Sequence, residues 1–222
     1  MRANKYRHII WDWNGTLFDD AWLCLEIING LLSARGLPTI TADQYEQTFG
    51  FPVIDYYHRI GFNFDIEPFE QVSTAFISEY ERRRVECSLR PGALTTIDGF
   101  RRHSISQSII SASKQAYLEK AVHQFDIRDR FHSISGLNNH HALGKLEIAL
   151  NWMIKTVINP RDILLIGDTI HDYDVAQGID AACILIYSGH QDKDRLADSG
   201  ARIIQDFSEL SEIFPHLEAQ YG

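Results

Sequence analysis

The chain has 222 residues, of which 45% are hydrophobic and 23% charged, and its formal net charge is −9. This composition is typical of a globular protein of one or two domains and excludes a largely disordered chain. The acidic charge argues against nucleic acid and membrane surfaces as partners. There is no apolar run of the roughly 18 residues that a membrane helix needs, and residues 1–8 lack the apolar stretch of a signal peptide. We therefore expect a cytoplasmic protein that binds neither nucleic acid nor a membrane.

Apolar runs alternate with helical patterns along most of the chain, as they do in parallel βαβ units. The expected strands are residues 6–11, 104–110, 163–166, 182–187 and 201–204. The expected helices between them include residues 114–125, 145–157 and 172–178. This alternation predicts an α/β fold with a Rossmann-like parallel sheet.

One long segment breaks the alternation. From Phe18 to Arg90 the sequence shows helical patterns without convincing strands, and turn signals such as Gly50-Phe51-Pro52 separate them. The segment carries 12 acidic residues and 6 arginines but no lysine. We expect a small helical domain at residues 18–90, inserted into an α/β core domain formed by residues 1–17 and 91–222.

Polar residues gather where the expected strands end. The first strand is followed by Asp12-Trp13-Asn14-Gly15-Thr16, and the second by Ser111-Ala112-Ser113-Lys114. A helix begins at Gly144-Lys145, and the third strand is followed by Gly167-Asp168 and the run from Thr169 to Asp172. Because ligands bind beyond the carboxyl ends of the strands in an open parallel sheet, we expect these groups to meet.

These residue types suit the chemistry of a phosphate. Asp12 and Asp168 would repel each other without a cation, and Mg²⁺ accepts two carboxylates and a backbone carbonyl as ligands. Ser111, Lys145 and the N–H groups of the Asn14-Gly15 turn can bind phosphate oxygens, and Asp12 can attack phosphorus. Each residue alone has a common structural role, such as a cap or a surface charge. Together and in this order they predict a phosphate site with a divalent cation.

The chain resembles the haloacid dehalogenase (HAD) superfamily and, within it, the phosphoglycolate phosphatase-like branch. The motifs are IIWDWNGTLFDD, SIISASK, the lysine of ALGKLEIAL, and ILLIGDTIHDYDVA, and the likeness covers nearly the whole chain. The resemblance implies a Rossmann-like core with a helical type-one cap at residues 18–90, Mg²⁺ as cofactor, and a small phosphorylated metabolite as substrate. It leaves open whether the protein is a monomer or a homodimer.

The same resemblance implies a role for each matching residue. The catalytic residues would be Asp12, Asn14, Lys145 and Asp172. The substrate-binding residues would be Gly15, Thr16, Ser111, Ala112 and Lys145. The metal ligands would be Asp12, Asp168 and the backbone carbonyl of Asn14. Asp12 would be the nucleophile, Lys145 would bridge it to the phosphate, and Asp172 would lie near Lys145 or a metal-bound water. The implied function is a phosphatase that acts through an aspartyl-phosphate.

The sequence departs from the family at Asn14. HAD phosphatases usually carry an Asp there, which protonates the leaving oxygen and then deprotonates the attacking water. An amide cannot shuttle a proton at neutral pH, and losing a general acid–base typically costs on the order of 10²–10⁴ in rate. Three interpretations stay open. The enzyme is slow on alkyl phosphates, His171 or Asp20 substitutes for the missing acid, or the chain is a weakened HAD-like protein that binds a phosphorylated ligand or partner.

Other chemistries of the family fit less well. Phosphonate cleavage needs a cap lysine, which residues 18–90 lack, and dehalogenases usually lack the pair Gly167-Asp168. A phosphomutase would need the acid–base that Asn14 replaces. Phe49 and Phe51 flank Gly50 in the expected specificity loop. This uncharged loop argues against a strongly anionic second group on the substrate, and so against phosphoglycolate itself.

Overall fold

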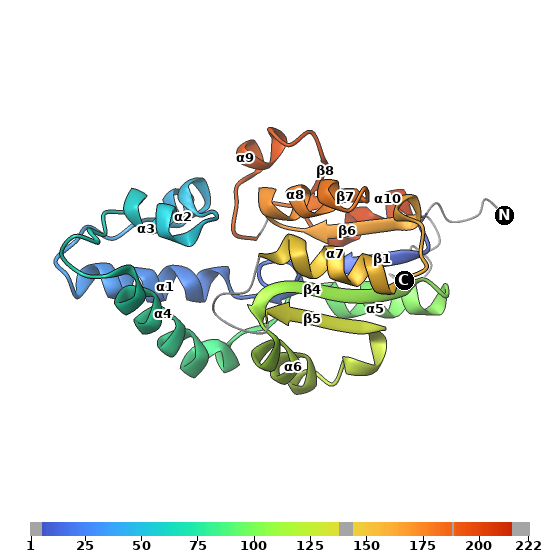
Figure 1. The fold of residues 1–222 in the computed structure, drawn as a ribbon, viewed down its shortest axis with the longest axis horizontal. Coiled ribbons are helices and arrows are strands. Elements are labelled where there is room, and N and C mark those ends of the chain that lie inside the picture. Colours follow the sequence, from blue (N-terminus) through green and yellow to red (C-terminus); the bar gives the residue numbers. More distant parts are fainter. Residues whose placement is uncertain (1–5, 138–143, 188, 215–222) are drawn as a thin grey trace.

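The fold is given by a computed structural model that describes residues 6–137, 144–187 and 189–214. Its main sheet has six parallel strands in the order β5-β4-β1-β6-β7-β8 (Figure 1). The strands are β1 His8–Trp11, β4 Ser106–Lys114, β5 Ser133–Leu137, β6 Ile163–Gly167, β7 Ala182–Ile186 and β8 Arg202–Ile204. The parallel sheet confirms the predicted Rossmann-like α/β fold.

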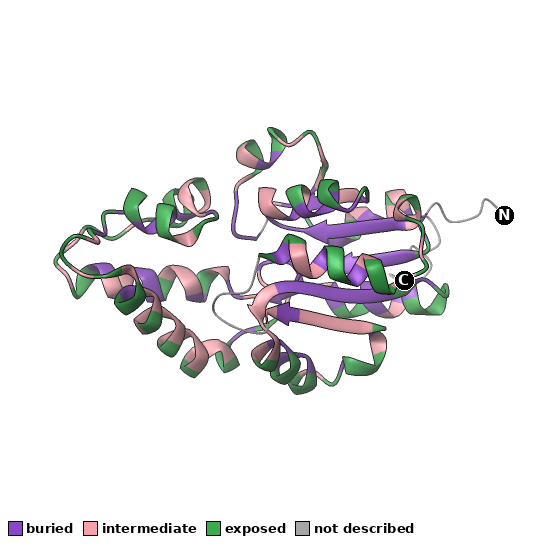
Figure 2. Cartoon of the chain, in the orientation of Figure 1, coloured by how far each residue is buried: buried purple, intermediate pink, exposed green. Residues whose placement is uncertain are grey.

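Helices cover both faces of this sheet. They are α5 Ala93–Arg102, α6 Gln115–Gln124, α7 Lys145–Lys155, α8 Ile170–Gly178, α9 Lys193–Ala197 and α10 Leu210–Ile213. Successive residues of a strand point to opposite faces. Ile9 and Trp11 of β1 therefore join the core that contains residues of α5, α6 and α10, whereas Ile10 joins the core with α7 and α8. Figure 2 shows β1, β4 and β6 buried along most of their length, with more exposed helices around them.

The segment between β1 and α5 is mostly helical, as expected. Its helices are α1 Ala21–Ser33, α2 Ala42–Thr48, α3 Val53–Arg59 and α4 Phe69–Arg83. They share a hydrophobic cluster of their own, which includes Ile28, Leu32, Tyr56 and Val72. Figure 1 shows these helices beyond the carboxyl ends of the parallel strands. The division into domains at residues 18 and 90 stays a prediction.

Several elements differ from the sequence-based expectations. The strand β5 was not expected, and two further strands, β2 (Phe18–Asp19) and β3 (Ser88–Leu89), pair in antiparallel fashion at the two ends of the helical segment. The short 3₁₀ helices are Arg84–Glu86, Arg128–Arg130, Pro160–Asp162 and Phe207–Glu209. Within the described part of the chain, every helix is too short or too polar to cross a membrane.

Candidate functional site

The residues predicted at the strand ends come together at the carboxyl edge of the sheet. Asp12 follows β1, Asp168 follows β6, and Lys145 is the first residue of α7. Ser111 lies in β4 where the register with β5 shifts, an irregularity that re-aims side chains near the end of a strand. These residues and Asp172 are buried, and they line a cavity of about 810 Å³.

Lys145 lies at the centre of this group. Its Nζ donates hydrogen bonds to the carboxylates of both Asp12 and Asp172, and the residue is only 2% exposed. Burial alone would lower the pKa of Lys145, but the two carboxylates outweigh it and raise the pKa. Burial raises the pKa of Asp12 to about 8, against the opposing charge of Lys145. Asp12 and Asp172 are buried with Asp168 beside this one lysine, so a further cation would be stabilised there.

Asp172 is held from both sides. One carboxylate oxygen contacts Lys145, while Oδ2 accepts hydrogen bonds from the Thr169 N–H at 3.0 Å and the Thr169 hydroxyl at 2.8 Å. Burial opposes ionisation of Asp172, but Lys145 and these hydrogen bonds outweigh it and hold the pKa below its ordinary value. We expected Asp172 to lie near Lys145 or a metal-bound water, and the structure places it beside Lys145.

Asp168 completes an acidic group. Its Oδ1 accepts a hydrogen bond from Thr16 Oγ1 at 3.1 Å, and its Oδ2 accepts one from the backbone N–H of His190 at 2.6 Å. Burial raises the pKa of Asp168 to about 6. Carboxylate oxygens of Asp12, Asp168 and Asp172 lie within 4.8 Å of one another. Hard oxygen ligands at this density fit Mg²⁺.

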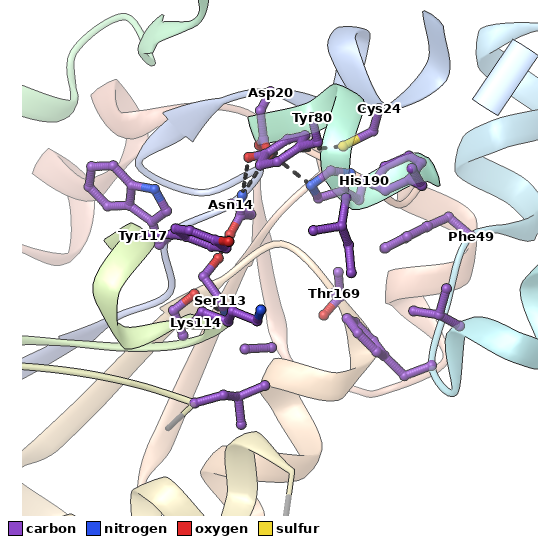
Figure 3. Close-up of a pocket in the computed structure, with 18 of the residues that line it drawn as sticks. Asn14, Asp20, Cys24, Phe49, Tyr80, Ser113, Lys114, Tyr117, Thr169 and His190 are labelled. Atoms are coloured by element: carbon purple, nitrogen blue, oxygen red, sulfur yellow. Dashed lines mark hydrogen bonds and ion pairs between the residues drawn. The ribbon is translucent and has the colours of Figure 1, made fainter. Parts of the chain in front are cut away.

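The side chain of Asn14 is fully engaged by neighbouring groups (Figure 3). Its Nδ2 donates to Asp20 Oδ2 at 2.6 Å and to the Tyr80 hydroxyl at 2.7 Å. The hydroxyl of Ser113 donates to the Asn14 Oδ1. An amide in this arrangement has no proton to give to a leaving group, so the structure offers no acid at position 14 itself.

Asp20 organises the neighbourhood of Asn14. It is fully buried and also accepts hydrogen bonds from the Gly15 N–H at 2.8 Å and the Tyr80 hydroxyl at 2.6 Å. Burial opposes ionisation of Asp20, yet His190, Tyr80 and Asn14 together lower its pKa. The Gly15 N–H, which we expected at the phosphate, therefore donates to a carboxylate of the protein.

His190 was missed by the sequence analysis. Its Nε2 lies 3.6 Å from Asp20 Oδ1, and its Nδ1 is 2.8 Å from the Tyr45 hydroxyl. Burial would lower the pKa of His190, but Asp20 and Asp168 raise it to about 9. His190 follows β7, so the strand-end rule that found Asp12 could have found it. Tyr45 and Tyr80 come from α2 and α4 and left no comparable signal.

The remaining expected residues also lie at the cavity. Ala112 lines it, and Ser111 Oγ accepts a hydrogen bond from the Ser113 N–H at 3.0 Å. His171 lines the cavity too, and its ring packs against Phe51 with a centroid separation of 4.9 Å. Asp20, by contrast, is hydrogen-bonded directly to Asn14. Of the two substitutes considered for the missing acid, the structure places Asp20 in contact with position 14.

The chain is similar to known proteins both in its fold and in its sequence pattern. Solved structures with a similar fold include a predicted phosphatase from Clostridium acetobutylicum, with a TM-score of 0.80 and 16% identity over 95% of this chain and 98% of that one. A haloacid dehalogenase-like family hydrolase from Streptococcus pneumoniae has a TM-score of 0.81 and 18% identity, over 95% and 99%. A predicted phosphoglycolate phosphatase from Haemophilus somnus has a TM-score of 0.76 and 17% identity, over 96% and 99%. No curated protein matches the sequence. The family model of haloacid dehalogenase-like hydrolases matches residues 9–186, and the chain belongs to this family.

Proposed function

We propose that the protein is a Mg²⁺-dependent phosphatase that hydrolyses a small phosphate monoester through an aspartyl-phosphate at Asp12. The observation that carries this proposal is the buried contact of Lys145 with both Asp12 and Asp172, next to the carboxylate of Asp168. Such a constellation concentrates negative oxygens around one cation and leaves Asp12 at the wall of a cavity. It suits the binding of a phosphate by cations and its attack by a carboxylate.

The reaction that we propose has two displacements. A carboxylate oxygen of Asp12 attacks phosphorus, the bond from phosphorus to the ester oxygen breaks, and that oxygen leaves with the electron pair and takes a proton from solvent. Water then attacks the phosphorus of the aspartyl-phosphate and gives up a proton to solvent, the bond to Asp12 breaks, and inorganic phosphate leaves. In the net reaction a phosphate monoester and water give an alcohol and inorganic phosphate, and the Asp12 carboxylate is restored.

The residues present divide the work between them. Lys145 orients Asp12 and offsets charge, Ser111 and Ala112 lie where phosphate oxygens would bind, and Asp172 keeps Lys145 in place. Asp12, Asp168 and the carbonyl of Asn14 would hold Mg²⁺. When bound, this ion supplies positive charge that stabilises the phosphate oxygens as they are transferred.

A second candidate function follows from Asn14. Because its amide is saturated by Asp20, Tyr80 and Ser113, nothing at position 14 can protonate a leaving alkoxide. The chain would then bind a phosphorylated ligand or partner without useful turnover. This candidate shares the cation site and the phosphate site with the first, and only turnover separates the two.

The test measures phosphate release from aryl and alkyl monoesters in Mg²⁺ by the wild type and by Asp12→Asn, with Asp162→Asn, outside the site, as a matched control. We expect release by the wild type and the control only. Turnover that survives in Asp12→Asn contradicts the proposal. Mg²⁺-dependent binding of fluoroberyllate without release from any ester supports the second candidate instead. Asp168→Asn should abolish the rise in melting temperature that Mg²⁺ causes, because a bound cation stabilises the folded state by mass action.

A further inference from the structure

The cavity beside Asp12 is much larger than a phosphate needs. It measures about 810 Å³, which lies in the range of pockets that hold drug-sized ligands. Most of its wall away from the carboxylates consists of aromatic and aliphatic side chains. These include Phe49, Phe51, Phe76, Ile77, Tyr80 and Tyr117. Figure 3 shows Phe49, Tyr80 and Tyr117 on different sides of the same space.

The apolar wall begins directly at the reacting groups. The hydroxyl of Tyr80 contacts the Asn14 amide, two residues after the nucleophile, and its ring stacks on Phe76 at a centroid distance of 6.1 Å. On another side, Phe51 packs against His171, the neighbour of Asp172. A phosphate at Asp12 would therefore place the group that it esterifies between ring faces and edges.

The two cations among these wall residues, Arg84 and Lys114, already have partners within the wall. The Arg84 guanidinium pairs with Glu81 at 3.1 Å and lies 5.8 Å from the centroid of the Tyr117 ring. The ammonium of Lys114 lies 5.2 Å from the same ring. Arg84 therefore has a carboxylate and an aromatic face as partners, and Lys114 has an aromatic face, so neither cation requires a second anion on the ligand. This arrangement favours a substrate whose esterified group carries no charge of its own.

The chemistry at position 14 points in the same direction. A phenolic oxygen has a pKa near 10, so it can leave as a phenolate without first receiving a proton. An aliphatic alkoxide is far more basic and leaves slowly without an acid. With the Asn14 amide held by Asp20 and Tyr80, a substrate with a good leaving group loses least.

We infer that the site selects aryl phosphates, in which an uncharged aromatic ring system occupies the cavity walled by Phe49, Phe51, Phe76, Ile77, Tyr80 and Tyr117. The inference rests on the proposed phosphatase function and adds the class of substrate. The bond that breaks joins phosphorus to the phenolic oxygen. That oxygen keeps the electron pair and is protonated by solvent.

The binding test uses two phosphonates, whose bond from phosphorus to carbon a phosphatase of the proposed mechanism does not cleave because it has no oxygen leaving group. The affinities of naphthylmethylphosphonate and methylphosphonate are measured by calorimetry on the wild type in Mg²⁺. We expect the naphthyl compound to bind at least about tenfold more tightly, because it buries apolar area that methylphosphonate lacks. Equal affinities would overturn the inference, whether or not the protein turns over any ester.

Two variants locate the effect. Phe51 is 45% exposed, so Phe51→Ala should fold, and it should reduce the preference for the naphthyl compound severalfold. Ile54→Ala is the matched control, since Ile54 is 37% exposed on the adjoining helix and does not line the cavity. An unchanged preference in Phe51→Ala, with an unchanged melting temperature, would contradict the assignment of this wall.

A turnover test separates ring recognition from leaving-group chemistry. The substrates are naphthyl phosphate, 2-(naphthyl)ethyl phosphate and ethyl phosphate, and the expected order of kcat/KM is the order in which they are named. Ethyl phosphate turned over as fast as naphthyl phosphate overturns the inference and leaves the phosphatase proposal intact. No turnover of any ester overturns the phosphatase proposal, while the phosphonate affinities still decide whether the cavity recognises rings.

Discussion

The amide of Asn14 and the carboxylate of Asp20 are joined by a hydrogen bond of 2.6 Å. Asp20 is fully buried, and it follows β2, eight residues after Asp12. A carboxylate therefore lies in contact with the position where the family usually carries its acid, although that position itself holds an amide.

This contact makes Asn14→Asp an informative change. The variant would place two carboxylates within hydrogen-bond distance, and like charges so close raise the pKa of one of them, which then keeps its proton. We expect release from alkyl phosphates to rise by roughly 10²-fold or more, and release from aryl phosphates to change little. The measurement is kcat for both classes of ester at saturating Mg²⁺.

The exchanged variant Asn14→Asp/Asp20→Asn is the control for this experiment. It restores one amide and one carboxylate in the same contact, so it should fold as stably as the wild type and keep the gain on alkyl phosphates. Asp20→Asn alone should bring no gain. Equal alkyl activity in the wild type and in Asn14→Asp would show that Asp20 or another group already supplies the proton.

Removal of the buried lysine should destabilise the fold as well as the reaction. Lys145→Met would leave Asp12 and Asp172 buried without their cation, and breaking a buried ion pair typically costs about 3–5 kcal/mol. Urea unfolding in the presence of a chelator measures the loss. Lys155→Met, on the exposed end of the same helix, should change stability by less than about 0.5 kcal/mol. Similar losses in the two variants would contradict the buried bridge.

Alanine substitutions at two glycines distinguish the effect of backbone strain from that of a steric clash. Gly15 and Gly36 have φ angles of +71° and +66°, so alanine at either should cost about 1–2 kcal/mol. A Cβ at Gly15 would also lie 2.2 Å from Asp168 Oδ2 and 2.5 Å from His190 Cδ2, whereas a Cβ at Gly36 would meet nothing within 4 Å. We expect Gly15→Ala to lose Mg²⁺ binding and phosphate release. Gly36→Ala should lose only stability. Equal Mg²⁺ binding by the two variants would contradict the close approach of Gly15 to Asp168 and His190.

His8 gives the stability a pH dependence. It is fully buried, it contacts Ser106, and the described residues give its Nε2 no hydrogen-bond partner. Burial, with a smaller effect of His132, lowers its pKa from 6.5 to about 4. The unfolded chain therefore takes up the proton first. The contribution of His8 to stability is complete above pH 6.5, and about 3 kcal/mol of it is lost as the pH falls towards 4.

Chemical unfolding at a series of pH values checks this. The variant His8→Phe, which keeps a ring against Trp152, should flatten the curve between pH 6.5 and pH 4. His123→Phe replaces an exposed histidine and should leave the curve unchanged. A slope that persists in His8→Phe would assign the acid sensitivity to other groups.

The strands that carry the site could be predicted because each combines a continuous apolar run with a polar end. β6 (Ile163–Gly167) is buried throughout, which is how a central parallel strand reads in a sequence. β5 (Ser133–Leu137) could not be predicted, since its sequence SISGL is short, polar and only partly buried. The two-residue strands β2 and β3 carry no periodic signal at all, and only their pairing defines them.

The site could be predicted where its residues lie in motifs that are recognisable in the sequence. Asp12, Lys145, Asp168 and Asp172 each lie in a motif, and the structure brings them together. The network around Asn14 was not predictable as a whole, because Tyr80 is separated from Asn14 by 66 positions and meets it only through the packing of α4. Hydrogen bonds of this kind depend on where a helix docks, and sequence spacing does not contain that information.

The antiparallel ribbon of β2 and β3 has a consequence for the architecture. Phe18 faces Leu89 and Asp19 faces Ser88, so the chain leaves and rejoins the sheet-bearing part at neighbouring points. A tight turn between these two strands would close the backbone without moving β1 or α5. Segments of different length and sequence could therefore be exchanged at this ribbon. Asp12, Lys145 and Asp168 lie outside the exchanged segment, whereas Asp20 and Tyr80, which hold Asn14, lie within it. The ribbon is thus the natural splice point for chimaeras with altered substrate choice.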